Sequence, residues 1–263
     1  MTAVDPKDAA LPRHSNTYQA LNRLIGKAIH RYGMIVDGDR IAVGLSGGKD
    51  SLTLLWSLAE RRKRVPVHFD LVPIYVDPGF ADGYGDALAD TCGQLGFSLI
   101  VDPTDHGIVA HSPGNRENPC FLCARQRRKR LFDIADQHGC SKLALGHNKD
   151  DLIETLFLNI CYAGRISTMM PCQPLFDGRF TVIRPLVMVD EKSIEHFARA
   201  QRFPRYTNPC PSSGSTKRSA VRNMLKGLYR TNPKIKGNIY RAMSHVKLEY
   251  LLVSEHDRLK KHP

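Results

Sequence analysis

A short apolar run that ends in glycines restricts this chain more than any other feature. Residues 40–45, RIAVGL, read as a buried strand, and SGGKDS at 46–51 leads into a helix-like segment at 50–64. Adjacent glycines let the backbone approach an anion without a Cβ clash, and a helix N-terminus attracts negative charge. The pattern therefore predicts a strand–loop–helix unit that binds phosphate at the carboxyl end of its strand.

Further strand-like runs alternate with helical segments along the chain. We expect strands at 69–77, 98–102, 142–147 and 180–186, and helices at 17–35, 81–97, from just after residue 123 to about 139, 150–164 and 191–203. Such alternation is typical of an α/β fold with a doubly wound, mainly parallel sheet. We predict a helical N-terminal extension (1–35), a central domain (36–205) and a basic helical C-terminal extension (206–263).

The charge balance favours a polyanionic partner. The chain has 38 Lys and Arg against 26 Asp and Glu, a formal net charge of +12 and a pI near 9.5. Such a surplus favours nucleic acid, because cationic side chains neutralise phosphates and release counterions. No apolar run reaches the ~20 residues that a membrane span needs, and the N-terminus has no signal pattern. We expect a cytoplasmic protein with reduced thiols and no membrane partner.

The glycine-rich segment 44–51 does not match two common phosphate loops. A Walker loop would need one more residue before its second glycine and a hydroxyl in place of Asp50, and a dinucleotide fingerprint would need glycine in place of Ser46. Lys49 adds positive charge, and Asp50 can hold the loop or a water on Mg²⁺. The predicted phosphate-binding residues are Gly44, Ser46, Gly47, Gly48, Lys49, Asp50 and Ser51.

The seven cysteines do not read as a disulfide framework. Cys92, Cys140 and Cys161 have apolar neighbours and are expected to be small buried side chains. Cys120 and Cys123 form a C-x-x-C pair ahead of the basic run 125–130. A further ligand candidate is Cys210, which also follows Asn-Pro.

Two metal centres are compatible with these thiols. A structural zinc site needs four ligands, and His111, His147 or Cys172 could complete one, although none has ligand-like spacing. Three thiolates without an evident fourth suit a [4Fe–4S] cluster with one open iron. Thiolate softness favours the cluster over hard ions.

SGGKDS resembles the PP-loop signature of the ATP pyrophosphatases. The resemblance implies a Rossmann-like adenine nucleotide α-hydrolase fold and ATP as a substrate, which is cleaved between its α- and β-phosphates to adenylate a carbonyl oxygen. It also implies that YVDPGF (75–80), with Val76 and Asp77, lines the adenine pocket. LGHNKDD (145–151) adds Gly146, His147, Asp150 and Asp151. The two carboxylates are either helix caps or, beside a nucleotide, ligands of Mg²⁺.

Residues 20–225 as a set resemble the TtcA branch of the TtcA/TtuA tRNA thiolation enzymes. The likeness lies in CFLCARQRRKRLF, LALGHNKDDLIETLFLNICYAG, VIRPL and the late Pro209-Cys210. It implies a [4Fe–4S] cluster on Cys120, Cys123 and Cys210, and replacement of the C2 oxygen of a tRNA cytidine at position 32 by sulfur. The late motif departs from P-C-x-x-C, because Ser213 stands where the branch has a second cysteine.

The resemblance also implies roles and partners. We expect Lys49, Asp50, Asp150, Asp151 and Arg127 to be catalytic, with ATP, tRNA and a sulfur donor (a cysteine desulfurase or sulfide) as partners. The oligomeric state is open, a homodimer included. The alternatives are another PP-loop tRNA-modifying ligase, a zinc-stabilised RNA-binding protein without ATPase activity, and sulfur transfer to a small molecule. The basic patches expected to bind RNA are Arg125, Arg127, Arg128, Lys129 and Arg130; Lys217, Arg218, Arg222, Lys226 and Arg230; and Lys234, Lys236, Arg241 and Lys247.

Overall fold

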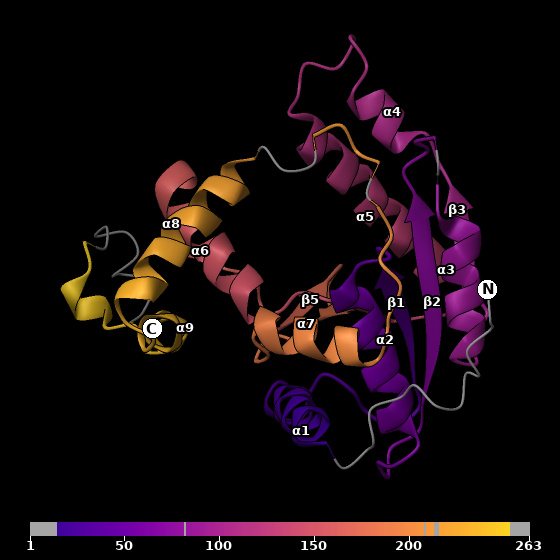
Figure 1. Ribbon diagram of the computed structural model, residues 1–263, viewed down its shortest axis with the longest axis horizontal. Coiled ribbons are helices and arrows are strands. Elements are labelled where there is room, and N and C mark those ends of the chain that lie inside the picture. The colour runs from indigo at the N-terminus through magenta and orange to yellow at the C-terminus, as the bar shows by residue number, and fades with distance from the viewer. Residues whose placement is uncertain (1–14, 82, 208, 213–215, 253–263) are drawn as a thin grey trace.

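The fold is built on a six-stranded sheet in which every neighbouring pair but one is parallel (Figure 1). The computed structural model describes residues 15–81, 83–207, 209–212 and 216–252. The strand order is β3-β2-β1-β4-β6-β5, and β5 runs antiparallel to β6. The predicted α/β fold with a mainly parallel sheet is confirmed. The strands are β1 (Asp39–Leu45), β2 (Phe69–Asp77), β3 (Ile100–Pro103), β4 (Lys142–Ala144), β5 (Cys172–Leu175) and β6 (Phe180–Ile183).

Helices cover both faces of the sheet, because the strands alternate their side chains between two cores. Ile41 and Val43 of β1 belong to the core beneath α1, α2, α3 and α7, whereas Ala42 belongs to the core beneath α5. The helices are α1 (Asn16–Arg31), α2 (Lys49–Arg62), α3 (Gly85–Gln94), α4 (His106–Ala110), α5 (Pro119–Gln137), α6 (Lys149–Ala163), α7 (Glu191–Ala200), α8 (Lys217–Thr231) and α9 (Ile235–Ala242).

The C-terminal helices pack on α6, on the side of the molecule away from β2 and β3 (Figure 1). Ile153 of α6 forms a small core with Val221 and Leu225 of α8, and Ile239 and Tyr240 of α9 pack against it. A 3₁₀ turn at Leu248–Tyr250 follows. Residues 1–14 of the predicted N-terminal extension lie outside the described residues. Within the described part, no helix is both long and apolar enough to cross a bilayer.

Several elements differ from their predicted bounds. β4 ends at Ala144 and β6 at Ile183, both three residues early; the chain after β6 meets Pro185, which cannot donate to a ladder. The sequence analysis did not predict α4 or β5. α5 begins at Pro119, so the C-x-x-C pair lies in its first turn rather than ahead of it.

The expectation for the three isolated cysteines was partly wrong. Cys92 and Cys140 are buried, but Cys161 is exposed. Cys161 lies in the last turn of α6, where Ile160 and Tyr162 are exposed as well. An apolar run at a helix end therefore did not indicate burial.

Candidate active site

The glycine loop, Ser46–Ser51, joins β1 to α2 at the carboxyl end of the sheet. Gly47 has φ +68°, and a Cβ on it would lie 2.6 Å from the Tyr84 ring, so only glycine fits. Ser51 Oγ donates to the Gly48 carbonyl (2.9 Å) and accepts from the Ser46 amide (3.2 Å). These bonds hold the loop in a tight turn over the N-terminus of α2, where free amides favour an anion.

Two tyrosines that the sequence analysis missed cover this loop. Tyr84 donates its hydroxyl to the Ser46 carbonyl (2.9 Å) and stacks on Tyr206, with ring centroids 4.8 Å apart. Tyr206 lies in the segment after α7 and bonds to Thr91 of α3 (2.8 Å). Beside Tyr206, Gly47, Gly48 and Lys49 line a cavity of about 350 Å³. This cavity is the candidate nucleotide site.

Lys49 faces two carboxylates rather than open solvent. Its Nζ lies 3.0 Å from Asp50 Oδ2 and 3.0 Å from Glu191 Oε1. Burial alone would lower the pKa of Lys49, but the two carboxylates outweigh it and raise that pKa above its ordinary value. Lys49 is therefore a fixed cation at the start of α2. Glu191 comes from α7, and no local signal at residues 44–51 could have identified it.

The GHNKDD segment brings the start of α6 against the glycine loop. A Cβ on Gly146 would lie 3.0 Å from the Ser51 amide nitrogen, so the two backbones approach closely. Asn148, not an aspartate, is the N-cap, and it forms a reciprocal capping box with Asp151. Asn148 Nδ2 also donates to Asp50 Oδ1 (2.9 Å). Of the two aspartates, which the sequence left open as caps or Mg²⁺ ligands, only Asp151 takes part in capping the helix.

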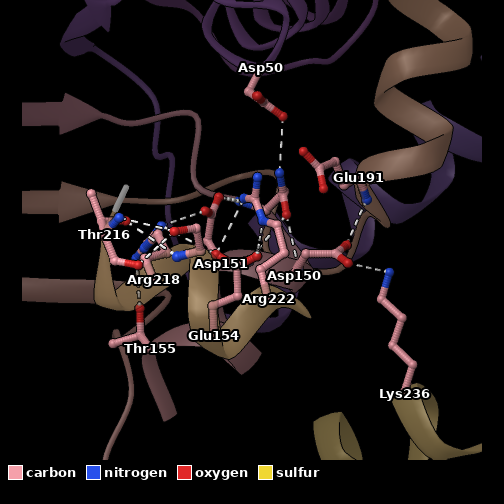
Figure 2. A network of polar contacts seen from close by, with 12 residues as sticks. Asp50, Asp150, Asp151, Glu154, Thr155, Glu191, Thr216, Arg218, Arg222 and Lys236 are labelled. Atoms are coloured by element: carbon pink, nitrogen blue, oxygen red, sulfur yellow. Dashed lines mark hydrogen bonds and ion pairs between the residues drawn. The ribbon is translucent and has the colours of Figure 1, made fainter. Parts of the chain in front are cut away.

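Both aspartates are tied to the C-terminal helices (Figure 2). Asp150 accepts from the Glu191 amide (2.7 Å) and pairs with Lys236 Nζ (2.6 Å). Asp151 pairs with Arg218 (2.9 Å). In the next turn of α6, the buried Glu154 pairs with Arg222 (2.6 Å).

These pairs change the interpretation of two basic patches. Arg218, Arg222 and Lys236 were expected on RNA-binding surfaces, but each contacts a carboxylate at the start of α6 or close to it. Ion pairs within the fold therefore neutralise most of the charge of these three side chains. We call the carboxylates Asp50, Asp150, Asp151, Glu154 and Glu191 and their basic partners Lys49, Arg218, Arg222 and Lys236 the paired network.

The predicted thiols come from two distant segments. Cys120 and Cys123 lie in the first turn of α5, where the side chain of Asn118 is the N-cap. Burial raises the pKa of the Cys123 thiol, Arg127 lowers it, and the neighbouring Cys210 and Cys120 thiols raise it further. Figure 1 shows the segment that follows α7 passing the start of α5. Among the described residues, no three His, Cys, Asp or Glu side chains are gathered closely enough to hold a metal ion as they stand.

His111 lies beside Cys210. Its Nε2 is 3.9 Å from Cys210 Sγ and 2.7 Å from Ser212 Oγ, while Nδ1 lies 2.8 Å from the Gly107 carbonyl. A carbonyl only accepts, so Nδ1 carries the proton in the neutral ring. Position 213, where the expected late motif departs from its pattern, lies outside the described residues.

Other predicted nucleotide-binding residues have structural roles. The Val76 side chain is 1% exposed and belongs to the core beneath α5, so only its backbone could meet a ligand. Asp77 Oδ1 accepts from the Gly79 amide (2.8 Å) and shapes the turn after β2. A Cβ on Gly44 would lie 2.9 Å from the Leu145 side chain, so this glycine serves packing within the sheet.

The buried Arg184 and the half-buried His147 form a hydrogen-bonded pair next to the glycine loop. Arg184 Nε donates to His147 Nδ1 (3.3 Å), and Arg184 NH1 donates to the Met170 carbonyl. Burial and nearby arginines lower the pKa of His147 to about 3, so the ring is neutral at physiological pH. A neutral ring that accepts at Nδ1 carries its proton on Nε2.

Comparison with known proteins identifies close relatives. The PP-loop domain family matches residues 15–228. A tRNA-cytidine(32) 2-sulfurtransferase from Geotalea daltonii is 42% identical over 238 residues, which are 89% of this chain and 94% of the relative. One from Geobacter sulfurreducens is 40% identical over 92% of this chain and 95% of the relative.

Two solved structures resemble the fold. The U34-tRNA thiolase NcsA from Methanococcus maripaludis, with its [4Fe–4S] cluster, has a TM-score of 0.73 and 27% identity over 89% of this chain and 80% of its own. The NH₃-dependent NAD synthetase from Campylobacter jejuni has a TM-score of 0.50 and 14% identity over 91% of this chain and 98% of its own, a likeness of fold alone.

Proposed function

The chain belongs to the PP-loop tRNA-cytidine(32) 2-sulfurtransferase family, and we propose that it replaces the C2 oxygen of cytidine 32 in tRNA by sulfur, using ATP. One observation carries the proposal. In the segment between α7 and α8, Tyr206 stacks on Tyr84 above the glycine loop, and four residues later Cys210 is near enough to Cys123 to raise the pKa of that thiol. A single strap thus links the candidate nucleotide site to the thiols.

In the proposed reaction, the glycine loop binds the phosphates of ATP. The C2 oxygen attacks the α-phosphorus, the bond to the β-phosphate oxygen breaks, and pyrophosphate leaves. Hydrosulfide from the sulfur donor then attacks C2 and gives up its proton, the C2–O bond breaks, and AMP leaves with the former C2 oxygen. Lys49 and the amides at the start of α2 stabilise the charge that develops on the phosphates.

The four carboxylates near the candidate nucleotide site fall into two pairs with different proposed roles. Asp50 lies in the glycine loop itself and shares Lys49 with Glu191, so these two oxygen donors fit Mg²⁺ beside the phosphates. Asp150 and Asp151 are bonded to Lys236 and Arg218. We propose that Asp150 and Asp151 position the loop and α6, and that they are not direct metal ligands.

The thiols fit a [4Fe–4S] cluster by the chemistry of their donor set. Cys120, Cys123 and Cys210 supply three soft donors, and Arg127 beside Cys123 favours the thiolate form. Three thiolates leave one iron open. When bound, such a cluster supplies a coordination position at which sulfur is carried to the base. A sulfur donor (a cysteine desulfurase or sulfide), a cytoplasmic location and a homodimer remain predictions.

The proposal is tested by mass spectrometry of tRNA nucleosides from cells that lack the gene. Expression of the wild-type chain should restore 2-thiocytidine, and Cys123→Ala should not, because a cluster ligand is lost. Cys161→Ala, an exposed thiol far along α6, is the matched control and should restore it. Unchanged 2-thiocytidine in the deletion strain would contradict the function.

Metal and nucleotide analysis separates the alternatives. Anaerobically purified protein should contain iron and absorb light at about 400 nm. One zinc per chain, without iron and without release of AMP, would favour an RNA-binding protein instead.

A further inference from the structure

A second cavity at the carboxyl end of the sheet is larger than the one at the glycine loop. It has a volume of about 910 Å³ and lies beneath α5, between the ends of β4 and β6 and the start of β5. Figure 1 shows α5, α6, α8 and β5, which contribute its lining, around one region. Its volume lies in the range of about 300–1,000 Å³ that is typical of small-molecule sites. We call it the arginine cavity.

The arginine cavity holds positive charge that the fold does not neutralise. Four arginines line it: Arg218 pairs with Asp151 and Glu154, whereas Arg127, Arg128 and Arg184 form no ion pair within the described residues. Arg184 is only 7% exposed. Arg127 Nε is buried and has no hydrogen-bond partner in the described part of the chain. The buried guanidinium of Arg184 has two neutral hydrogen-bond partners and no carboxylate partner among the described residues, so an anionic ligand would balance a charge that the surrounding groups leave unbalanced.

The remaining lining is suited to a flat ring. Met169 and Met170 form part of the wall, and methionine adapts its shape to aromatic surfaces. Phe176 adds an aromatic face. The neutral His147 lines the same space with a ring N–H that can donate to a carbonyl oxygen.

The cavity adjoins both halves of the proposed chemistry. Ala124, which lines it, follows Cys123, and His147 follows Gly146, whose backbone touches the glycine loop. The candidate nucleotide site is separate and lies at α7 and the strap. The cavity therefore lies next to the segments that carry the thiols and the glycine loop, although its lining contains neither the three cysteines nor residues 46–51.

We propose that the arginine cavity receives the target nucleotide of the RNA, turned out of its loop, with its flanking phosphates on Arg127, Arg128 and Arg184 and its base against Met169 and Met170. This inference rests on the proposed function. A base in an RNA loop can be splayed out and stacked on side chains, and guanidinium groups bind phosphate with a matching fork of donors.

Binding measurements with an unmodified tRNA transcript that has cytidine at position 32 test the proposal. Arg128→Gln and Arg184→Gln should each weaken tRNA binding about tenfold. Each should also make the slope of the logarithm of the binding constant against the logarithm of the salt concentration less steep by about 0.7 per lost phosphate contact. ATP binding should not change. Arg184→Lys, which keeps the charge, should recover part of the loss, and Arg23→Gln on the exposed face of α1 is the matched control.

A second measurement locates the base directly. A transcript with 5-iodocytidine at position 32 should, on irradiation, form an adduct within residues 168–176. Arg128 is exposed, so its replacement should leave the thermal unfolding midpoint unchanged and keep the test valid if Arg184→Gln is unstable.

The outcomes separate this inference from the proposed function. Wild-type protein that forms 2-thiocytidine while both arginine variants bind tRNA normally, or with the adduct elsewhere, overturns the cavity alone. RNA seated in the cavity without any 2-thiocytidine supports the cavity and contradicts the function. Wild-type protein that binds no tRNA overturns both.

Discussion

The paired network and the arginine cavity lie side by side at the carboxyl end of the sheet, but they differ in whether their charged side chains have partners of opposite charge. In the paired network, Asp150, Asp151 and Glu154 each have a basic partner (Figure 2). In the arginine cavity, Arg127, Arg128 and Arg184 have no carboxylate partner among the described residues.

The difference indicates that the two regions are organised for different purposes. The paired network fixes its side chains before any ligand arrives, which suits chemistry that depends on preorganised charge. The three unpaired arginines of the arginine cavity repel one another, and an incoming anion would offset that repulsion. The formal net charge of +12 is thus not spread evenly. α8 and α9 place part of their basic residues inside the fold. In α5, Arg125 and Arg130 pair with Glu117 and Asp102, whereas Arg127 and Arg128 form no ion pair among the described residues.

The largest expected effect comes from removing Lys49, the fixed cation at the candidate nucleotide site. Lys49→Met should reduce ATP turnover about 10²- to 10³-fold, because the phosphates lose a charge that stabilises the transition state. The tRNA affinity should stay within about twofold, since Arg128 and Arg184 are unaffected. Pyrophosphate release and tRNA binding, measured on the same protein, check both expectations.

Lys63→Met is the control for this prediction. Lys63 follows the last residue of the same helix, is mostly exposed and, within the part of the chain that the structure describes, pairs with Glu60 alone. If Lys63→Met also lost ATP turnover, the effect of Lys49→Met would not be specific to the nucleotide site. If Lys49→Met lost tRNA binding, ATP turnover and tRNA binding would not be separable functions of the two regions.

How much the sequence predicts depends on how local each feature is. The glycine loop and the C-x-x-C pair were predictable, because a strand end, two glycines and a helix start are encoded within a dozen residues. Glu191 was not, since it meets Lys49 across 142 positions of sequence. Tyr84 and Tyr206 read as ordinary aromatic residues until the fold stacks them above Gly47.

Charge was the least predictable property. Arg222 and Lys236 lie in basic runs that look like RNA-binding surfaces, yet they face Glu154 and Asp150. Arg184 lies in a predicted strand end and gave no sign of lining a cavity. A basic run indicates the sign of the charge, but only the packing of α8 and α9 on α6 shows where the carboxylates lie.

Removing a buried carboxylate from the paired network should have the next largest effect. Glu154 is 3% exposed and pairs with Arg222 and Arg218. Glu154→Gln should lower the free energy of unfolding by about 2 kcal/mol, less than for a fully buried pair because both arginines can regain water. Urea titration measures the change. Glu195→Gln, from an exposed pair with Arg199 on α7, should cost less than about 0.5 kcal/mol.

Acid should weaken, in a defined pH window, the ion pairs of Glu191 and of Asp190, which lies outside the paired network but shares Lys236 with it. Burial raises the pKa of Asp190, but Lys236 and Lys149 outweigh it and hold that pKa below its ordinary value. Glu191 is lowered in the same way, against its burial, by Lys49. Both groups have a lower pKa in the folded state than in the unfolded state. Their contribution is therefore present above about pH 4 and is lost as the pH falls through the folded values.

Lys236→Met removes one of the partners and should shift the acid-unfolding midpoint to higher pH. The expected cost at neutral pH is about 1 kcal/mol, because Lys236 is largely buried between Asp150 and Asp190. Circular dichroism across an acid titration measures both values. Lys234→Met, an exposed lysine at the start of α9, should not shift the midpoint.

The smallest expected effect is also the sharpest test of the comparison, because one substitution should act in opposite directions in the two regions. Arg222→Gln in the paired network leaves Glu154 with a weaker set of partners and should destabilise the fold by about 1 kcal/mol. Arg128→Gln in the arginine cavity should change stability by less than about 0.5 kcal/mol, and in the stabilising direction. Burial and the charge of Arg128 lower the pKa of Arg184 to about 10, so the folded state disfavours the charged form of Arg184. Removing Arg128 relieves part of that cost, and added tRNA should reverse the order by stabilising the wild type more than Arg128→Gln. If Arg128→Gln is destabilised as much as Arg222→Gln in the absence of RNA, Arg128 has an internal partner and the arginine cavity is not waiting for an anion.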